Sequence, residues 1–142
     1  MGLAEQSGFI RYQAVLPNSR GIYPGIFGLA NGLAASGKLS AEDWAAWRSA
    51  NDRADCAYVD PATVDPSVYD RDINPTAQAW FKATARRLLQ DIDMDFYEDL
   101  LRRYRVEYEV VTSDDPGSLL YEDDVQIVVA PRQAEPGTSI TR

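Results

Sequence analysis

Histidine is absent from the chain, and cysteine occurs once, at Cys56. The absence of histidine excludes the usual general base of neutral-pH catalysis, the usual zinc ligand and every catalytic triad that depends on histidine. With a single cysteine as well, a transition-metal site would consist of oxygen ligands alone, which suit zinc and copper poorly. We therefore expect no metal centre and no cofactor.

Membrane and secretory features are also missing. A lone cysteine cannot form an intramolecular disulfide, which fits a reducing compartment. No apolar run approaches the length of a membrane span. The opening stretch, MGLAEQSGF, contains neither the basic region nor the apolar run of a signal peptide. These features predict a soluble cytoplasmic protein that does not interact with a membrane.

Positive charge is in deficit: 14 lysines and arginines stand against 22 aspartates and glutamates, for a net charge of −8. A negative protein repels nucleic acid and anionic membrane surfaces. Basic residues do cluster at residues 82–87 and 102–105, but the second cluster has acidic neighbours, and we interpret both as solvated helix surfaces. We predict that nucleic acid is not a partner.

Length and pattern indicate one folded domain, because 142 residues suit a single core and show no internal repeat. We predict a single α+β domain over residues 1–131 and a polar, flexible tail over residues 132–142. The first strand and a C-terminal three-strand meander would form a small, mainly antiparallel sheet, with three or four helices packed on one face. Strands are expected at residues 9–16, 106–111, 118–122 and 125–131, and helices at residues 25–37, 41–54, 76–92 and 96–104. The last two helices either form one continuous helix or separate near Asp93.

Individual residues indicate where these helices begin and end. Gly37 suits the left-handed position after the first helix, and Ser40, with Asp43 three residues on, resembles a capping box at the start of the second. Asn74 before Pro75 is a natural N-cap for the third helix. That helix would bury an apolar stripe with helical spacing, made of Trp80, Phe81, Thr84, Leu88 and Ile92.

The stretch RGIYPGIF, residues 20–27, joins the first strand to the first helix. If Gly25 opens that helix, its unpaired N–H groups and the helix dipole favour a bound anion. Arg11 on the strand and Arg20 before the turn would add positive charge, and Tyr23 lies in the same turn. We predict a site for a small anionic ligand formed by Arg11, Arg20, Tyr23 and Gly25. The alternative is a plain strand-to-helix connection.

Glu107 and Glu109 lie on one face of a predicted strand. Paired carboxylates can carry acid–base or glycosidic chemistry when their pKa values differ. This chain has an arginine on its first strand and an E-x-E pair late in the sequence, an order that loosely resembles that of ADP-ribosyltransferases. The serine motif that those enzymes carry between the two is missing here. We take Glu107 and Glu109 as candidate catalytic residues; the alternative is a solvent-facing side of the sheet.

The segment 59–75, VDPATVDPSVYDRDINP, is rich in aspartate and proline and is predicted to be an extended loop. Within it, DRDIN has the spacing that opens an EF-hand loop, but Pro75 and Phe81 stand where that loop requires glycine and glutamate. A weak calcium site of another kind stays open. Aspartates that form turns are the alternative, so the loop is either functional or structural.

The strings RGIYPGIFGLANGLAASGKLSAEDW and YEDDVQIVVAP resemble a family of small bacterial proteins of uncharacterised function. The resemblance covers most of residues 9–131, implies one complete domain and carries no activity across. Three functions stay open. The first is a binding or accessory protein that recognises a small anionic molecule or a protein. The second is an enzyme acting on a nucleotide or sugar phosphate. The third is an inhibitor or antitoxin that binds a basic partner.

Overall fold

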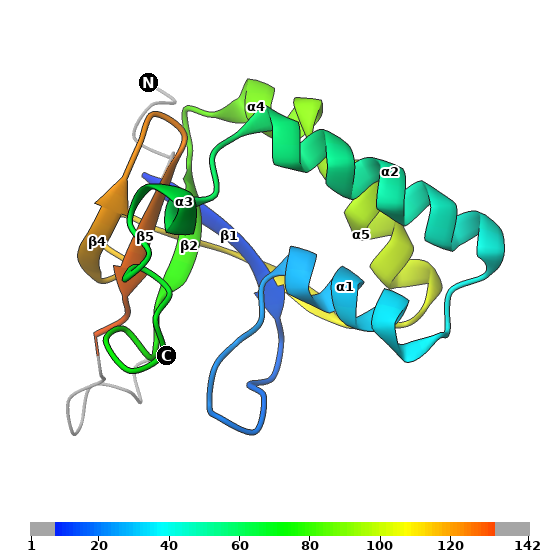
Figure 1. The fold of residues 1–142 in the computed structure, drawn as a ribbon, viewed down its shortest axis with the longest axis horizontal. Helices are drawn as coiled ribbons and strands as arrows, with labels where there is room; N and C mark the ends of the chain where they lie inside the picture. Colours follow the sequence, from blue (N-terminus) through cyan, green and yellow to red (C-terminus); the bar gives the residue numbers. More distant parts are fainter. Residues whose placement is uncertain (1–7, 133–142) are drawn as a thin grey trace.

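The computed structural model describes residues 8–132, which form a five-stranded antiparallel sheet and five helices (Figure 1). The predicted α+β class is confirmed, while the predicted tail lies outside the described residues except for residue 132. The strands are β1 (Phe9–Ala14), β2 (Gln78–Lys82), β3 (Tyr108–Ser113), β4 (Ser118–Glu122) and β5 (Gln126–Ala130). The helices are α1 (Ile26–Ser36), α2 (Ala41–Ala57), α3 (Pro61–Val64), α4 (Arg86–Asp91) and α5 (Met94–Arg103).

The strands are arranged in the order β3-β1-β2-β5-β4. β4 and β5 form the expected hairpin, in which the Asp123 carboxylate accepts the N–H groups of Val125 and Gln126, both at 3.0 Å. β3 instead pairs with β1 along its whole length. The predicted three-strand meander is therefore wrong, because β3 and β4 are the two opposite edges of the sheet.

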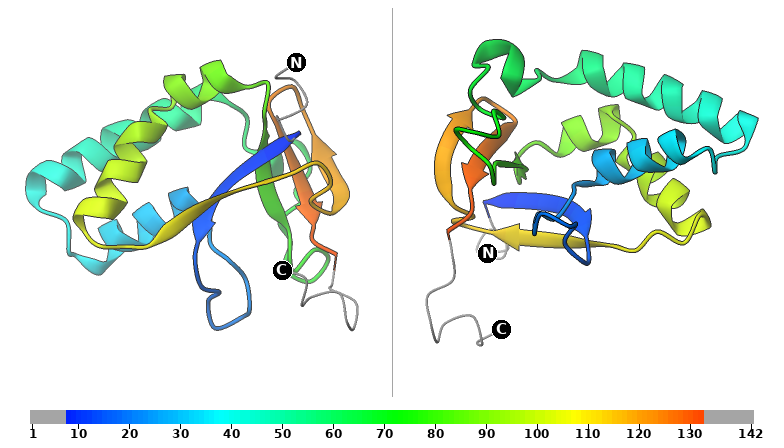
Figure 2. Two further views of the ribbon diagram at one scale, coloured as in Figure 1. Left: turned by 180° about the vertical axis from the view of Figure 1, so that it is seen from behind. Right: turned by 60° about the horizontal axis from the view of Figure 1, so that its bottom comes forward.

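Only residues 114–117 connect these two edges. Four strand spacings of about 4.8 Å would separate the edges of a flat sheet by about 19 Å, which is about the full reach of so short a connection. The sheet is curled instead: β3 passes behind β2 and β5 in the view of Figure 1, and the left view of Figure 2 shows it from the other side, crossing toward β4. Within the curl, Val111 of β3 packs against Trp80, Ile127 and Val129. A short connection thus joins strands that do not pair, which is why the sequence predicted the wrong order.

β2 replaces the first half of the helix predicted over residues 76–92. Trp80 and Phe81 point to opposite faces of the sheet: Trp80 is buried beside Ile127 inside the curl, whereas Phe81 packs against the helices. Adjacent aromatic side chains suit a strand covered on both faces. The helix in this region begins only at Arg86.

Helices α1, α2, α4 and α5 surround the main core, and aromatic side chains of the sheet close it from one side. Two of the predicted helix ends are confirmed: Gly37 is left-handed (φ 78°), and the Ser40 hydroxyl accepts the N–H of Asp43 at 3.0 Å. Asp93, also left-handed at φ 59°, separates α4 from α5. Three large side chains of α5, Tyr97, Leu100 and Leu101, and Ile92 directly after α4 have no exposed surface.

Asp43, in the first turn of α2, also connects this helix to α5. Its carboxylate accepts two N–H groups of Arg103, at 2.9 and 3.1 Å, and the hydroxyl of Tyr104 at 2.6 Å. These contacts join the start of α2 to the end of α5. The hydrogen bonds from Arg103 and Tyr104 lower the pKa of Asp43 to about 2.

We expect folding stability to fall as the pH drops from about 4 toward 2. The pKa of Asp43 is about 2 in the folded protein and about 3.9 in an unfolded chain, so its ionised form contributes stability at higher pH that is lost through this window. Asp43→Asn should lower stability at pH 7 and flatten the decline, measured by urea unfolding at each pH. Asp91→Asn, an exposed control, should leave the profile unchanged, and an equally steep decline in Asp43→Asn would contradict the assignment.

β1 and β2 pair only at Phe9–Lys82 and Ile10–Phe81. Beyond Ile10 the two strands diverge, β1 remaining beside β3 and β2 beside β5 (Figure 1). The N-terminal end of α1 and the segment that follows α2 lie over this opening (Figure 1). The divergence therefore leaves a hollow between the sheet, the two helices and the aspartate- and proline-rich loop.

Candidate functional site

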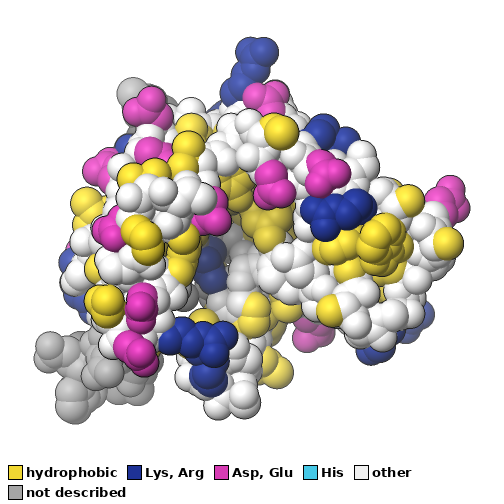
Figure 3. Space-filling model, viewed as in Figure 1, with side chains coloured by type: hydrophobic (Ala, Val, Ile, Leu, Met, Phe, Trp, Pro, Cys, Tyr) yellow, Lys and Arg dark blue, Asp and Glu magenta, His cyan; other side chains and the backbone are white. Residues whose placement is uncertain are grey.

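A cleft of about 500 Å³ occupies this hollow. Figure 3 shows it near the centre of the molecule, with Lys or Arg side-chain atoms at its bottom. Its walls come from α1, α2, the segment 58–69, β2 and β5. A second lobe of about 270 Å³ extends toward β1 and the start of α1. The two lobes are one cleft, because they share lining residues: Phe27, Tyr58, Tyr69, Ala79 and Gln126.

Arg11 is the basic group of the second lobe, and its side chain is only 8% exposed. Its guanidinium bridges the diverging strands, donating to the carbonyl of Ala79 on β2 and to the carbonyl of Tyr23, each at 2.7 Å. A third bond, at 2.8 Å, goes to the side-chain oxygen of Gln13. All three acceptors are neutral, and none of the ion pairs among the described residues involves Arg11.

Burial lowers the pKa of Arg11 to about 10, so the group stays charged at neutral pH. A buried cation is normally paired with an acid, because removal of its hydration shell costs several kcal/mol. The three bonds use three of the five N–H groups that a guanidinium carries. Arg11 therefore keeps both an unneutralised charge and donor capacity in the wall of the cleft.

The N-terminal end of α1 lies against this guanidinium. Gly25 is the N-cap residue and has no side chain to cap the helix. A Cβ atom added at Gly25 would lie 3.6 Å from both terminal nitrogens of Arg11, so the absent side chain leaves their approach open. The first residues of α1 line the same lobe. The helix dipole thus adds partial positive charge beside Arg11.

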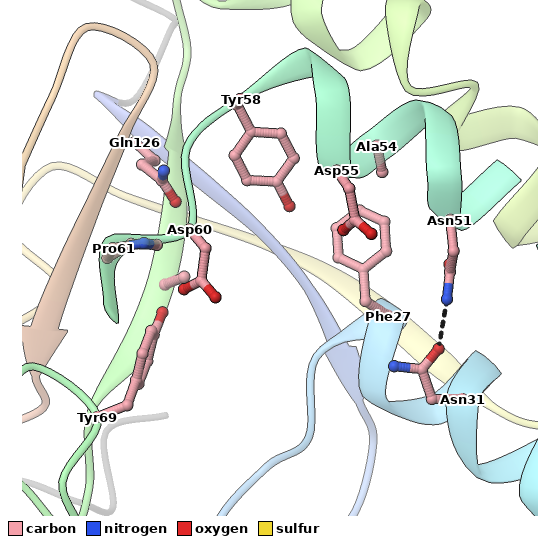
Figure 4. Close-up of a pocket in the computed structure, with 11 residues that line it drawn as sticks. Phe27, Asn31, Asn51, Ala54, Asp55, Tyr58, Asp60, Pro61, Tyr69 and Gln126 are labelled. Atoms are coloured by element: carbon pink, nitrogen blue, oxygen red, sulfur yellow. Dashed lines mark hydrogen bonds between the residues drawn. The ribbon is translucent and has the colours of Figure 1, made fainter. Parts of the chain in front are cut away.

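Two tyrosines, Tyr58 and Tyr69, line both lobes. Burial is the main reason why the pKa of Tyr58 is raised, and it raises the pKa of Tyr69 to about 12, so both phenols are neutral at pH 7. Within the described residues, neither hydroxyl takes part in a hydrogen bond. Figure 4 shows the hydroxyl of Tyr58 directed into the cleft. Both phenols are therefore donors available to a bound molecule.

Two carboxylates line the lobe of the cleft that Arg11 does not line. Asp55, on the last turns of α2, and Asp60, just before α3, line its larger lobe (Figure 4). Both raise the pKa of Tyr58, although burial raises it more. On Tyr69, burial again dominates, while Arg11 lowers the pKa and Asp60 raises it. Tyr69, which lines both lobes, is thus close enough to the basic and the acidic group for each to act on its phenol.

The aspartate- and proline-rich loop is an ordered wall of the cleft. Asp60, Asp65 and Asp70 each accept the N–H of the residue two positions on, at 2.8 to 3.1 Å. Asn74 donates its amide to the carbonyl of Ser67 at 2.8 Å. The predicted role of Asn74 as a helix N-cap is therefore wrong, because β2 follows it, and the alternative of turn-forming aspartates is confirmed.

The predicted ligand-binding residues are only partly brought together. Arg11, Tyr23 and Gly25 line one lobe of the cleft. Arg20 lies on an exposed turn organised by Asn18, whose side chain accepts the N–H of Arg20 at 2.9 Å, and Arg20 is not part of the lining.

The candidate catalytic pair lies elsewhere. Glu109 is exposed on β3 and accepts a long hydrogen bond, 3.4 Å, from Gln13. Glu107 is exposed just before that strand, in a shallow depression beside Tyr108. Neither carboxylate lines the cleft that contains Arg11.

Several lining residues were not predicted. Tyr69 and Asp60 lie in the loop of residues 59–75, which the sequence marked as functional or structural without naming either. Asp55 and Tyr58 come from the end of α2, and Gln126 from β5. No spacing in the sequence relates α2 to β5, so these groups emerge only from the folded arrangement.

None of the helices within residues 8–132 combines the length and apolar character needed to cross a membrane. In the same part of the chain, no three acidic or cysteine side chains gather closely enough to hold a metal ion. Comparisons of the chain with protein-family models, with curated proteins and with solved structures found no match. The resemblance to small bacterial proteins stays a prediction, and function is argued from the cleft itself.

Proposed function

We propose that this is a cytoplasmic binding protein for a small anionic molecule, which occupies the cleft and neutralises Arg11. The observation that carries the proposal is a guanidinium, 8% exposed, that forms hydrogen bonds to neutral acceptors alone among the described residues. An anion beside it would replace the missing charge partner with charge-assisted hydrogen bonds. The exposed Cys56 fits a reducing compartment.

The shape of the site supports the same function. Ligand clefts of a few hundred Å³ typically combine apolar walls with a few converging polar groups. Here Phe27 and the two tyrosines supply the walls, and Arg11 with the start of α1 supplies the anion-binding end. The alternative enzyme, with Glu107 or Glu109 as its acid or base, requires one of these carboxylates beside Arg11, and both lie outside the cleft lining.

The test is calorimetric titration and thermal unfolding with inorganic phosphate and with small carboxylates such as succinate. Binding to the folded state raises the melting temperature by mass action. We expect saturable binding that weakens by about 30-fold or more in Arg11→Met, since charge-assisted hydrogen bonds contribute about 2 kcal/mol or more. Arg20→Met, which removes an exposed arginine outside the lining, is the matched control and should bind normally.

Arg11 also bridges β1 and β2, so its replacement can weaken the fold. Gly25→Ala tests the site with Arg11 in place, because the added methyl would contact both terminal nitrogens at 3.6 Å and cover their open side. It should weaken anion binding while the melting temperature without ligand changes little. Absence of binding by the unmodified protein, or loss of binding in Arg20→Met alone, would contradict the proposal.

A further inference from the structure

The acidic end of the cleft points to a second feature of its ligand. We infer that the bound molecule carries an ammonium group as well as an anionic group, the first near Asp55 and Asp60 and the second at Arg11. This inference rests on the proposed function and narrows its ligand class to amino-bearing acids, either carboxylates or phosphates.

The two carboxylates have capacity for a cation. None of the ion pairs among the described residues involves Asp55 or Asp60. Asp60 uses one oxygen to accept the N–H of Ala62 at 3.0 Å, and Asp55 accepts no hydrogen bond from the described residues. Figure 4 shows both side chains on the cleft side of their segments, with the hydroxyl of Tyr58 in the space between them. An ammonium in that space would meet acceptors from two elements.

Aromatic rings line the same space. Phe27, Tyr58 and Tyr69 belong to the larger lobe with the two aspartates. Aromatic faces attract ammonium groups through their quadrupoles, and the attraction grows when water is displaced. Carboxylates beside aromatic faces suit an organic cation better than a metal ion, because calcium requires six to eight oxygen ligands and an aromatic face provides none.

The order of groups along the cleft matches a single bipolar molecule. Arg11 lines one lobe and the two aspartates line the other, while Tyr58 and Tyr69 line both. A molecule with its anionic group at Arg11 would thus pass two phenol donors before its other end reaches the carboxylates. The two phenols can donate hydrogen bonds to oxygen atoms along its length.

The experiment compares matched probes that differ by one amino group. Calorimetry would use glycine, β-alanine, 4-aminobutyrate and 5-aminopentanoate against the alkanoates of the same length, and phosphoethanolamine against ethyl phosphate. We expect at least one amino-bearing probe to bind tenfold or more tightly than its amine-free match. The preferred chain length then reports the separation of the two charged sites.

Asp55→Asn removes one carboxylate charge at an exposed position of α2. It should abolish the advantage of the amino group while leaving the affinity for the amine-free anion unchanged or increased. Asp52→Asn, also exposed on α2 but outside the cleft lining, is the matched control and should keep the full advantage.

The outcomes separate this inference from the proposed function. Equal, Arg11-dependent binding of amino-bearing and amine-free probes would overturn the inference and leave the proposed function standing. No binding by any anion would overturn both. Calcium chloride alone should produce no thermal shift, and a calcium shift that Asp55→Asn removes would replace the ammonium with a metal ion.

Discussion

Replacing Gly117 with alanine is expected to destabilise the protein by about 3 kcal/mol, because no space exists for a side chain there. A Cβ atom at this position would lie 2.8 Å from the carbonyl carbon of Ala130 and 3.0 Å from the Cα of Pro131. Real Cβ atoms do not approach other atoms so closely, and these neighbours are backbone atoms that cannot rotate away. The chain itself would have to shift.

The position of Gly117 makes such a shift costly. It ends the short connection by which the chain passes from β3 to β4, at opposite edges of the curled sheet. The same connection is attached to the start of β1, where the N–H of Gly8 donates to the carboxylate of Asp114 at 2.8 Å. Movement at Gly117 would therefore disturb the closure of the curl and the packing inside it.

Urea unfolding measures the effect, and Gly32→Ala is the matched control. Gly32 is exposed within α1, and an added Cβ would meet no atom within 4 Å. Alanine favours a helix over glycine, so this variant should gain about 0.5 to 1 kcal/mol. Equal small effects at the two positions would show that the chain does not pass so close to Ala130.

The sequence predicted the helices that carry their own boundary signals. Gly37 and Ser40 mark ends that the structure confirms, and of the two alternatives left open at Asp93 the structure has the break. β2 was missed because no glycine or proline occurs between Thr76 and Asp93, so nothing interrupts the apolar spacing where strand gives way to helix. The position of β3 was missed for a different reason: curling of a sheet is a tertiary property that no local signal reports.

The site was predicted in part for a similar reason. Arg11, Tyr23 and Gly25 lie close in the chain around one strand-to-helix connection, and their joint placement follows from that connection. The acidic end depends on the angle at which α2 approaches the sheet and on the divergence of β1 from β2. These are consequences of packing between distant segments, which explains why Asp55 carried no signal in the sequence.

Gln126 links this packing to the cleft. It is 2% exposed on β5, and its amide nitrogen donates to the carbonyl of Val59 at 2.7 Å and to the carboxylate of Asp123 at 3.1 Å. Val59 lies directly between Tyr58 and Asp60 in the chain. One buried amide therefore positions the turn that brings both residues into the lining.

Gln126→Glu is expected to destabilise the protein by about 3 kcal/mol at pH 7, because it places a carboxylate against two acceptors in a buried site. Burial beside Asp123 raises the pKa of the introduced carboxyl above its unfolded value of about 4.3. The destabilisation should therefore be small near pH 4 and should grow as the pH rises, since the unfolded chain ionises first. Anion binding at pH 7 should weaken as well, because the turn at Val59 is displaced.

The measurement is the difference in unfolding free energy between Gln126→Glu and the unmodified protein at pH 4, 5.5 and 7. Gln90→Glu, at an exposed position on α4, is the matched control and should differ by less than about 0.5 kcal/mol throughout. A pH-independent loss would mean that shape rather than charge decides the effect at Gln126. An unchanged unfolding free energy at every pH would mean that the contact with Val59 does not stabilise the turn. The residues Tyr58 and Asp60 would then not depend on β5 for their position in the cleft.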